Sequence, residues 1–202
     1  MKLPVEYYLS EDVVGIGKDL VGKKLCTNID GKFTSGIIAE TEAYAGINDQ
    51  ASHAWNNRRT KRTEVMYMKG GVAYIYLCYG IHHLFNVVTN REDIPHAVLI
   101  RSIIPIDGIE HMLKRRGMNK ADAKLTSGPG SLSRALGITC DYAACDLTAD
   151  TIWIEDGIKI PSTNITVSKR IGVDYAGKDA GLPYRFSLDK TAPCHITKAT
   201  IN

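Results

Sequence analysis

Carboxylates and aromatic rings recur at alternate positions along two segments of the chain's first half, a spacing that places side chains on one face of a β-strand. Glu40, Glu42 and Tyr44 share one face of the first segment, and Tyr74 and Tyr76 share one face of the second. A carboxylate held among rings is costly to bury without a task. Such faces could supply a general acid or base beside surfaces on which a flat ligand stacks.

The segment 45–69 between these strands is polar and turn-like, and a loop of this length inside a domain is usually functional or disordered. Its charge predicts a local surface for a polyanion. The alternative is that its charges are simply solvated and that the tyrosines serve strand packing. The second half of the loop sets one acid, Glu64, against five cations: Arg58, Arg59, Lys61, Arg62 and Lys69.

Composition bounds the class of protein. The chain has 202 residues, 44% of them hydrophobic and 23% charged, with a net charge of +3. This predicts one globular domain over residues 1–202 and excludes a disordered or collagen-like chain. No apolar run is long enough to span a membrane, and we expect no signal peptide. The five cysteines show neither a metal nor a disulfide framework, which indicates reduced thiols and a cytoplasmic location.

Periodicity predicts the elements that position these residues. Strands dominate and connect without regular crossover helices, so the fold class expected is α+β with a largely antiparallel sheet. One helix starts near Ser10, another starts at Asp107 through a capping box with Glu110, and a third starts at Gly128 and ends at Gly137. The predicted strands are 25–29, 35–44, 72–79, 83–89 and 96–104, followed by short strands after residue 151.

The motifs, taken in order, resemble the alkyladenine (3-methyladenine) DNA glycosylase family. The resemblance runs from about Leu9 to about Pro193, and the ordered series with compatible spacing is specific although each motif alone is weak. The matching residues are Glu40-Thr41-Glu42-Ala43-Tyr44, Asp49, His53, Arg62, Met66, Gly71, 74–80, Asn86, 97–101, 127–129, 135–136 and 170–173.

The resemblance implies a catalytic pair. Glu42 matches the family's general base, which activates a water for attack at C1′ of a flipped nucleotide. Arg101 matches the arginine that helps to position this water and Glu42. As a bare residue, Arg101 could equally be an ion-pair partner, and we interpret Glu40 as a solvated strand carboxylate.

The resemblance also implies a base pocket. Tyr44, His53 and Tyr76 match the rings between which the extruded purine stacks, and Asn86 matches the residue that excludes the amino group of normal guanine. Alkylation at N3 or N7 gives a purine positive charge, and a cation on an electron-rich ring gains about 0.5–2 kcal/mol. Packing tyrosines, a capping histidine and a sheet-edge amide are the plainer alternatives.

The predicted contacts with duplex DNA lie around this pocket. Tyr79 matches the residue that enters the minor groove and fills the gap left by the flipped nucleotide. Met66 and Leu99 are expected near this wedge. The Gly128-Pro129 helix start could bind a phosphate, although Ser131 replaces a lysine common in the family. Candidate phosphate contacts are Arg58, Arg59, Lys61 and Arg62.

The resulting hypothesis is a base-excision-repair DNA glycosylase that acts on alkylated or deaminated purines in double-stranded DNA. The fold implied is a single compact domain with a curved sheet, flanking helices and a DNA-probing β-hairpin. No lysine matches a Schiff-base nucleophile, so we expect a monofunctional enzyme without lyase activity, metal or cofactor. We expect a monomer in the cytoplasm, associated with the nucleoid if the source is bacterial. The alternatives are a non-catalytic module that binds damaged nucleic acid and a sheet-based interaction protein.

Overall fold

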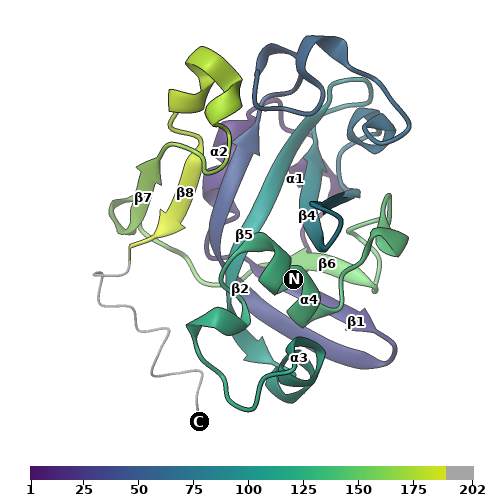
Figure 1. Cartoon of the computed structure of the whole chain (residues 1–202), viewed down its shortest axis with the longest axis vertical. Helices are drawn as coiled ribbons and strands as arrows, with labels where there is room; N and C mark the ends of the chain where they lie inside the picture. Colours follow the sequence, from purple (N-terminus) through teal and green to yellow (C-terminus); the bar gives the residue numbers. More distant parts are fainter. Residues whose placement is uncertain (190–202) are drawn as a thin grey trace.

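A curled antiparallel sheet forms the centre of the molecule (Figure 1). The computed structural model describes residues 1–189, and in it the strands follow the order β3-β4-β5-β2-β1-β6, with β8 paired to β2 and β7 paired to β8. The strands are β1 Lys24–Ile29, β2 Lys32–Tyr44, β3 Ala73–Cys78, β4 His82–Thr89, β5 His96–Asp107, β6 Ile152–Glu155, β7 Ile165–Ser168 and β8 Arg185–Leu188.

The long strand β2 is the branch point of this sheet. Along one edge it pairs with β5, and along the other it pairs first with β1 and then, from Glu40 to Glu42, with β8. Its register with β5 shifts between Ile38 and Thr41, and such bulges bend a strand and re-aim its side chains. The two glutamates of the predicted site therefore lie where the sheet forks.

The α-helices within residues 1–189 are short. They are α1 Val5–Tyr8, α2 Val13–Asp19, α3 Ile109–Arg116 and α4 Pro129–Leu136. Helices α3 and α4 lie side by side, with α4 against β4 and β5, and α2 packs against β2 (Figure 1). Apolar residues at helical spacing, such as Leu132 and Leu136, are fully buried. Asp12 caps α2 by accepting a hydrogen bond from the Gly15 N–H at 2.8 Å.

The structure confirms the predicted fold class, and each predicted strand and helix is present with small shifts at its ends. The capping box is wrong. Asp107 is the last residue of β5 and accepts a hydrogen bond from the Ser35 hydroxyl at 2.5 Å, so it cannot cap α3. The chain instead turns into α3 through Gly108, whose φ of 68° and whose approach to the Phe33 carbonyl leave no room for a Cβ.

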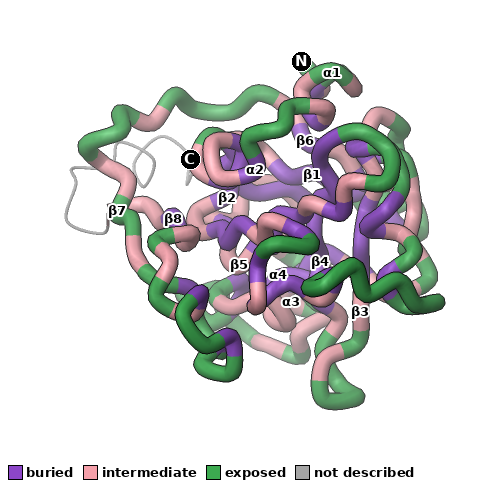
Figure 2. The backbone as a smooth tube through the Cα atoms, turned by 90° about the horizontal axis from the view of Figure 1, so that it is seen from above, coloured by how far each residue is buried: buried purple, intermediate pink, exposed green. Residues whose placement is uncertain are grey.

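Buried and exposed residues lie in different parts of the backbone (Figure 2). The buried backbone gathers along β2, β4 and β5, whereas the turn that follows β3 is exposed and stands apart from the body. None of the helices within residues 1–189 is long and apolar enough to cross a membrane. One of the five cysteines, Cys194, lies outside the described residues.

Candidate active site

A cavity of about 200 Å³ opens between strands β3 to β5 and the segment that follows Arg170. It lies at the end of β2 that carries Glu42 and Tyr44, so the fork in the sheet supplies one wall. Aromatic, apolar and polar side chains share the lining, which includes Tyr44, His53, Tyr74, Tyr76, Asn86, Leu99, Arg101, Ile171 and Tyr175.

Three rings form one aromatic wall of this cavity. The centroids of His53 and Tyr76 are 4.7 Å apart with their planes at 74°, and those of Tyr74 and Tyr76 are 5.5 Å apart at 33°. His53 also contacts the Tyr74 hydroxyl through Nδ1, at 2.8 Å. The histidine belongs to a long loop, and these contacts attach it to β3. The loop histidine is therefore held against the two tyrosines of β3, and the three rings together offer a surface to a planar ligand.

His53 is held in its neutral form. Burial, then the positive charges of Arg62 and Arg58, lower its pKa to about 4. Arg62 Nη2 lies 3.2 Å from His53 Nε2, and a guanidinium can only donate. Nε2 must therefore accept, so the proton of the neutral ring is on Nδ1 and is donated to Tyr74 Oη.

Glu42 lies directly behind the cavity wall and is fully buried. Its Oε1 accepts a hydrogen bond from the Ile171 N–H at 2.8 Å, and its Oε2 accepts one from the Tyr44 hydroxyl at 2.8 Å. Arg101 Nη1 lies 3.3 Å from Oε2. All three partners line the cavity, whereas Glu42 itself does not. The carboxylate is thus separated from the cavity by the groups that donate hydrogen bonds to it.

The Tyr44 hydroxyl is a permanent donor to this carboxylate. Burial, and secondarily the negative charge of Glu42, raise the pKa of Tyr44 well above its ordinary value. The ring also lies 4.8 Å from the guanidinium carbon of Arg170. Tyr44 therefore joins the carboxylate to a second buried cation.

Glu40 holds Arg101 from the other side. Glu40 Oε1 accepts hydrogen bonds from Arg101 Nε at 2.9 Å and from Arg185 Nε at 2.6 Å, and its side chain is mostly buried. The interpretation of Glu40 as a solvated carboxylate is therefore wrong, because β8 joins β2 at this point and brings Arg185 over it. The resulting chain of charges runs from Arg185 through Glu40 and Arg101 to Glu42.

A buried ion pair supports the back of the site. Both terminal guanidinium nitrogens of Arg170 contact the Asp49 carboxylate, Nη2 at 2.8 Å from Oδ1, and both side chains are almost completely buried. Arg170 also donates to the carbonyls of Ala43 and Asp179. The next residue, Ile171, donates a backbone hydrogen bond to Glu42. The Asp49–Arg170 pair therefore helps to fix one of the donors that hold the Glu42 carboxylate.

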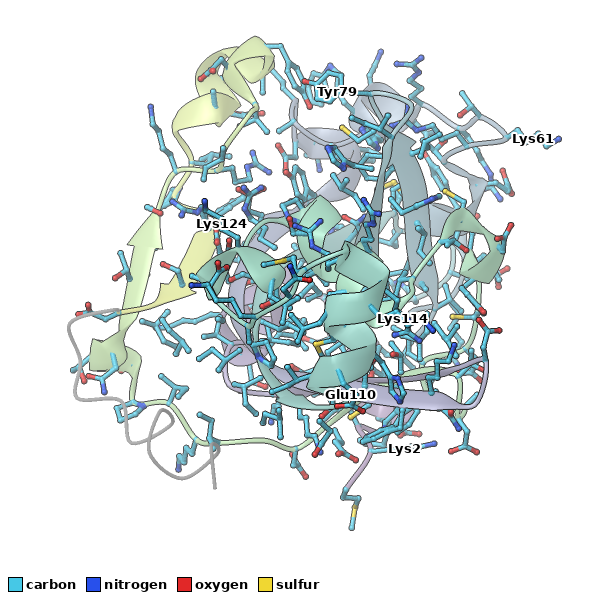
Figure 3. All side chains as sticks on the ribbon, turned by 60° about the horizontal axis from the view of Figure 1, so that its bottom comes forward. Lys2, Lys61, Tyr79, Glu110, Lys114 and Lys124 are labelled. Carbon is cyan, nitrogen blue, oxygen red and sulfur yellow. The ribbon has the colours of Figure 1, made fainter. Side chains whose placement is uncertain are left out.

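The β3–β4 hairpin tip stands at the mouth of the cavity. Tyr79 also lines the cavity, yet it is 92% exposed and occupies the edge of the molecule in Figure 3. The Ile81 N–H bonds to the Cys78 carbonyl at 3.1 Å and closes a turn in which Tyr79 and Gly80 have φ of 51° and 73°. A left-handed tyrosine is uncommon, and such strain collects at functional sites.

The chain matches known proteins over nearly its whole length. The family model described as "Methylpurine-DNA glycosylase (MPG)" matches residues 7–192. A relative from Chlamydia abortus is 49% identical over 187 residues, which is 92% of this chain and 97% of the relative. Relatives from Clostridium acetobutylicum and Bacillus mycoides are 44% identical and cover 93% and 94% of this chain, and 94% and 97% of their own lengths. All three carry the name "Putative 3-methyladenine DNA glycosylase".

The chain belongs to the methylpurine-DNA glycosylase family. This confirms the resemblance inferred from the motifs and places the chain among the hydrolases of DNA repair. Within the described structure, the residues that the resemblance assigned to catalysis and base binding converge on one cavity and the carboxylate behind it. They are Glu42, Arg101, Tyr44, His53, Tyr76 and Asn86, with Tyr79 at the mouth.

The four candidate phosphate contacts of the basic loop do not share one environment. Arg59 is held in ion pairs with Glu64 and Asp93, each at 2.7 Å, and Arg62 is turned toward His53. Arg58 and Lys61 are exposed, and Lys61 projects away from the body (Figure 3). Arg59 and Arg62 thus have side-chain partners, although both are exposed like Arg58 and Lys61.

Other expected contacts are placed more plainly. Met66 and Leu99 are buried and line the same cavity as Tyr79. The Asn86 side-chain amide donates to the carbonyls of Tyr74 and Leu84 at 3.0 and 3.3 Å, which fixes its orientation. Residues 1–189 contain no group of three or more His, Cys, Asp or Glu that could hold a metal ion.

Sequence reasoning missed the partners that come from the last part of the chain. Ile171, Tyr175 and Arg185 lie far from β2 in the sequence. Ile171 and Tyr175 reach the site from the segment that joins β7 to β8, and Arg185 reaches it from β8 itself. The motif around Arg170 and the isolated Asp49 were visible in the sequence.

Proposed function

We propose that this chain is a monofunctional DNA glycosylase that extrudes an alkylated or deaminated purine from duplex DNA and hydrolyses its N-glycosidic bond. The observation that carries this proposal is the Glu42 carboxylate, which is held by Tyr44, Arg101 and the Ile171 N–H at the wall of an aromatic cavity. An isolated buried carboxylate is costly, and this one is oriented toward a space that can hold a planar base.

The ring wall supplies base binding. A purine stacked beside Tyr44, His53 and Tyr76 replaces water on flat apolar surfaces, and each such stack contributes about 1–3 kcal/mol. His53 is neutral at physiological pH because its pKa is lowered to about 4. It therefore adds ring surface without adding a positive charge, which suits both alkylated and deaminated purines.

The chemical step is the addition of water to C1′. The water oxygen bonds to C1′ while Glu42 takes a proton from it, and the glycosidic C–N bond breaks with its electron pair going to the base. A cationic alkylated base leaves as a neutral molecule, whereas a neutral base leaves with a proton gained from solvent. The Arg101 contact is the longest of the three made by Glu42, at 3.3 Å, and we place the water beside it.

Glu40 and Arg185 act as positioning residues in this mechanism. Arg101 bridges Glu40 and Glu42 with different nitrogens, so its guanidinium is held from two sides. Arg185 in turn fixes Glu40. A guanidinium fixed in this way orients the water without reorganisation during the reaction.

The hairpin tip supplies extrusion. Tyr79 is exposed, apolar and held in a strained turn beside the cavity mouth, which suits insertion into the base stack as a nucleotide leaves it. Unstacking costs a few kcal/mol, and a plug that fills the gap retains the flipped state. Arg58 and Lys61 are exposed cations available to phosphates. We expect the enzyme to act as a monomer in the cytoplasm, and sedimentation of the purified protein tests the first expectation.

The test uses duplexes that each carry one lesion, either 7-methylguanine, hypoxanthine or ethenoadenine, and an undamaged control. We expect release of free base from at least one lesion duplex, and strand breakage only after the abasic product is treated with alkali. Strand cleavage without alkali would contradict a monofunctional enzyme. Tight binding of lesion duplexes without base release would instead support the non-catalytic binding module.

A further inference from the structure

Three arginines surround the base cavity. Arg101 lines it, Arg170 lies 4.8 Å from the ring centroid of Tyr44, and Arg62 lies 4.9 Å from that of Tyr76. Two rings of the pocket thus already carry a guanidinium on one face. Cations in such positions interact with the ring quadrupole and influence whatever stacks on the same ring.

Two of the three charges are neutralised locally. Asp49 pairs with Arg170 in a buried bidentate contact, and Glu40 and Glu42 both pair with Arg101. Arg62 differs, because none of the ion pairs found among residues 1–189 includes it. Its Nη2 instead donates a hydrogen bond to the neutral His53 ring. Arg62 therefore holds an uncompensated positive charge directly against the rings of Tyr76 and His53.

We propose that Arg62 is a specificity-determining residue of the base pocket, whose uncompensated charge beside Tyr76 and His53 favours extruded bases that are neutral over bases that are positively charged. This inference rests on the proposed function and deepens it. It moves Arg62 from the group of candidate phosphate contacts to the outer side of the pocket's aromatic wall. The chemical class favoured is the neutral purine lesion, of which hypoxanthine is an example.

The reason is electrostatic. Arg62 is not one of the lining residues, so it covers Tyr76 from outside the cavity and a bound base meets the ring from within. A ring that already attracts one cation is a weaker partner for a second, and the two like charges also repel. His53 cannot offset this repulsion, because its two nitrogens are used by Arg62 and Tyr74.

The neighbouring lysine provides a matched control. Lys61 adjoins Arg62 in the same loop and has the same charge, but it extends from the body into solvent (Figure 3). Removing either side-chain charge changes the net charge of the protein equally. Of these two residues, only Arg62 holds its charge against rings that line the cavity.

The experiment compares single-turnover release of 7-methylguanine and of hypoxanthine from duplexes of the same sequence. For the wild-type enzyme and for Arg62→Gln, Arg62→Lys and Lys61→Gln, we measure the ratio of the two rates. We expect Arg62→Gln to raise the ratio of cationic to neutral base release by about fivefold, a value reduced by solvent screening of this exposed side chain. Arg62→Lys keeps the charge and should stay within about twofold of wild type, and Lys61→Gln should leave the ratio unchanged.

Binding of undamaged duplex, measured over a range of salt concentrations, separates this role from a phosphate contact. An unchanged ratio in Arg62→Gln would overturn the inference. So would an equal loss for both lesions together with a decrease of about 0.9 in the salt slope. If the wild-type enzyme released neither base, the proposed function would fail. The relative affinities of the two lesion duplexes for wild type and Arg62→Gln would then test the inference separately.

Discussion

The wall of the cavity and the tip of the β3–β4 hairpin are adjacent, yet they contrast in construction. In the wall, Glu42 is fully buried, both its oxygens accept hydrogen bonds, and the arginines around it are themselves paired. At the tip, Tyr79 and Ile81 are 92% and 72% exposed, and Tyr79 is held in a left-handed turn. One region is fixed by charge and burial, and the other projects apolar side chains into solvent.

This contrast indicates a division of labour. Chemistry requires groups that do not reorganise, which a buried and fully paired network supplies. Entry into a base stack requires apolar surface that is exposed before DNA binds, which is unfavourable in water but available at a short turn. The same strand, β3, joins the two regions, since Tyr76 belongs to the pocket and Tyr79 belongs to the tip.

The largest effect is expected at the centre of the wall. Glu42→Gln should retain binding to a lesion duplex and lose base release by several orders of magnitude, because an amide keeps the shape but accepts no proton. A general base alone contributes about 10²–10⁴-fold, and the loss of water orientation adds to this. The measurements are single-turnover base release and equilibrium binding of the same duplex.

Glu40→Gln is the matched control. This substitution removes a charge of the same type two residues away and loosens Arg101, but it leaves the general base Glu42 in place. The rate of base release should therefore fall only about tenfold. Equal losses in the two variants would contradict the assignment of Glu42 as the base and Glu40 as a positioning residue.

Removing the support behind the wall should cost stability. Asp49→Ala leaves the buried Arg170 guanidinium without its carboxylate. Breaking a buried pair from one side typically costs about 3–5 kcal/mol of the free energy of unfolding. Urea unfolding measures this change directly. Tyr79→Ala, at the exposed tip, should stay within about 0.5 kcal/mol of wild type, and a similar loss in both variants would erase the contrast between the two regions.

The pH dependence of stability reports on His53. Burial and the nearby arginines lower its pKa to about 4 in the folded protein, against 6.5 as the ordinary value. Above pH 6.5 the ring is neutral in both states and costs nothing. As the pH falls from 6.5 to 4, His53 binds a proton in the unfolded chain but largely stays neutral in the folded protein. The free energy of unfolding therefore falls by about 3 kcal/mol.

His53→Asn should lack this part of the acid-induced loss. The free energy of unfolding of the two proteins, measured in urea at intervals between pH 7 and pH 4, should therefore converge as the pH falls. Parallel curves would show that His53 titrates normally and that the aromatic wall is open to solvent.

Much of this architecture can be predicted from the sequence. Alternation along β2 and β3 indicates both strands and the faces that carry Glu42 and Tyr76. The order of motifs indicates the family and the candidate residues. These inferences succeed because strand periodicity is local and the motifs stand in a fixed order.

The remainder depends on contacts between distant segments. Asp49 and Arg170 are 121 residues apart, and Arg185 reaches Glu40 from 145 residues away, so no local pattern announces either pair. The capping box failed for the same reason, because pairing of Asp107 with Ser35 in the sheet outweighs a local helix signal. The orientation of Arg62 toward His53 is likewise a property of the folded loop.

The division between the two regions is tested most directly by Tyr79→Ala and Tyr76→Ala, compared on the same lesion in two settings. In one duplex the lesion is well paired, and in the other it lies opposite a mismatch that weakens the stack. Tyr79 fills the gap left by extrusion, so its loss should matter most where extrusion costs more of the few kcal/mol that unstacking requires. Tyr76 is a wall of the pocket, and a weaker duplex cannot replace it.

We therefore predict that the mismatch restores much of the single-turnover excision lost in Tyr79→Ala and little of that lost in Tyr76→Ala. The ratio of paired to mismatched rates, normalised to wild type, is the quantity to measure. A decrease of about tenfold for Tyr79→Ala in the paired duplex alone would support the account. Equal losses in both duplexes would contradict it and leave Tyr79 as a packing residue of the hairpin.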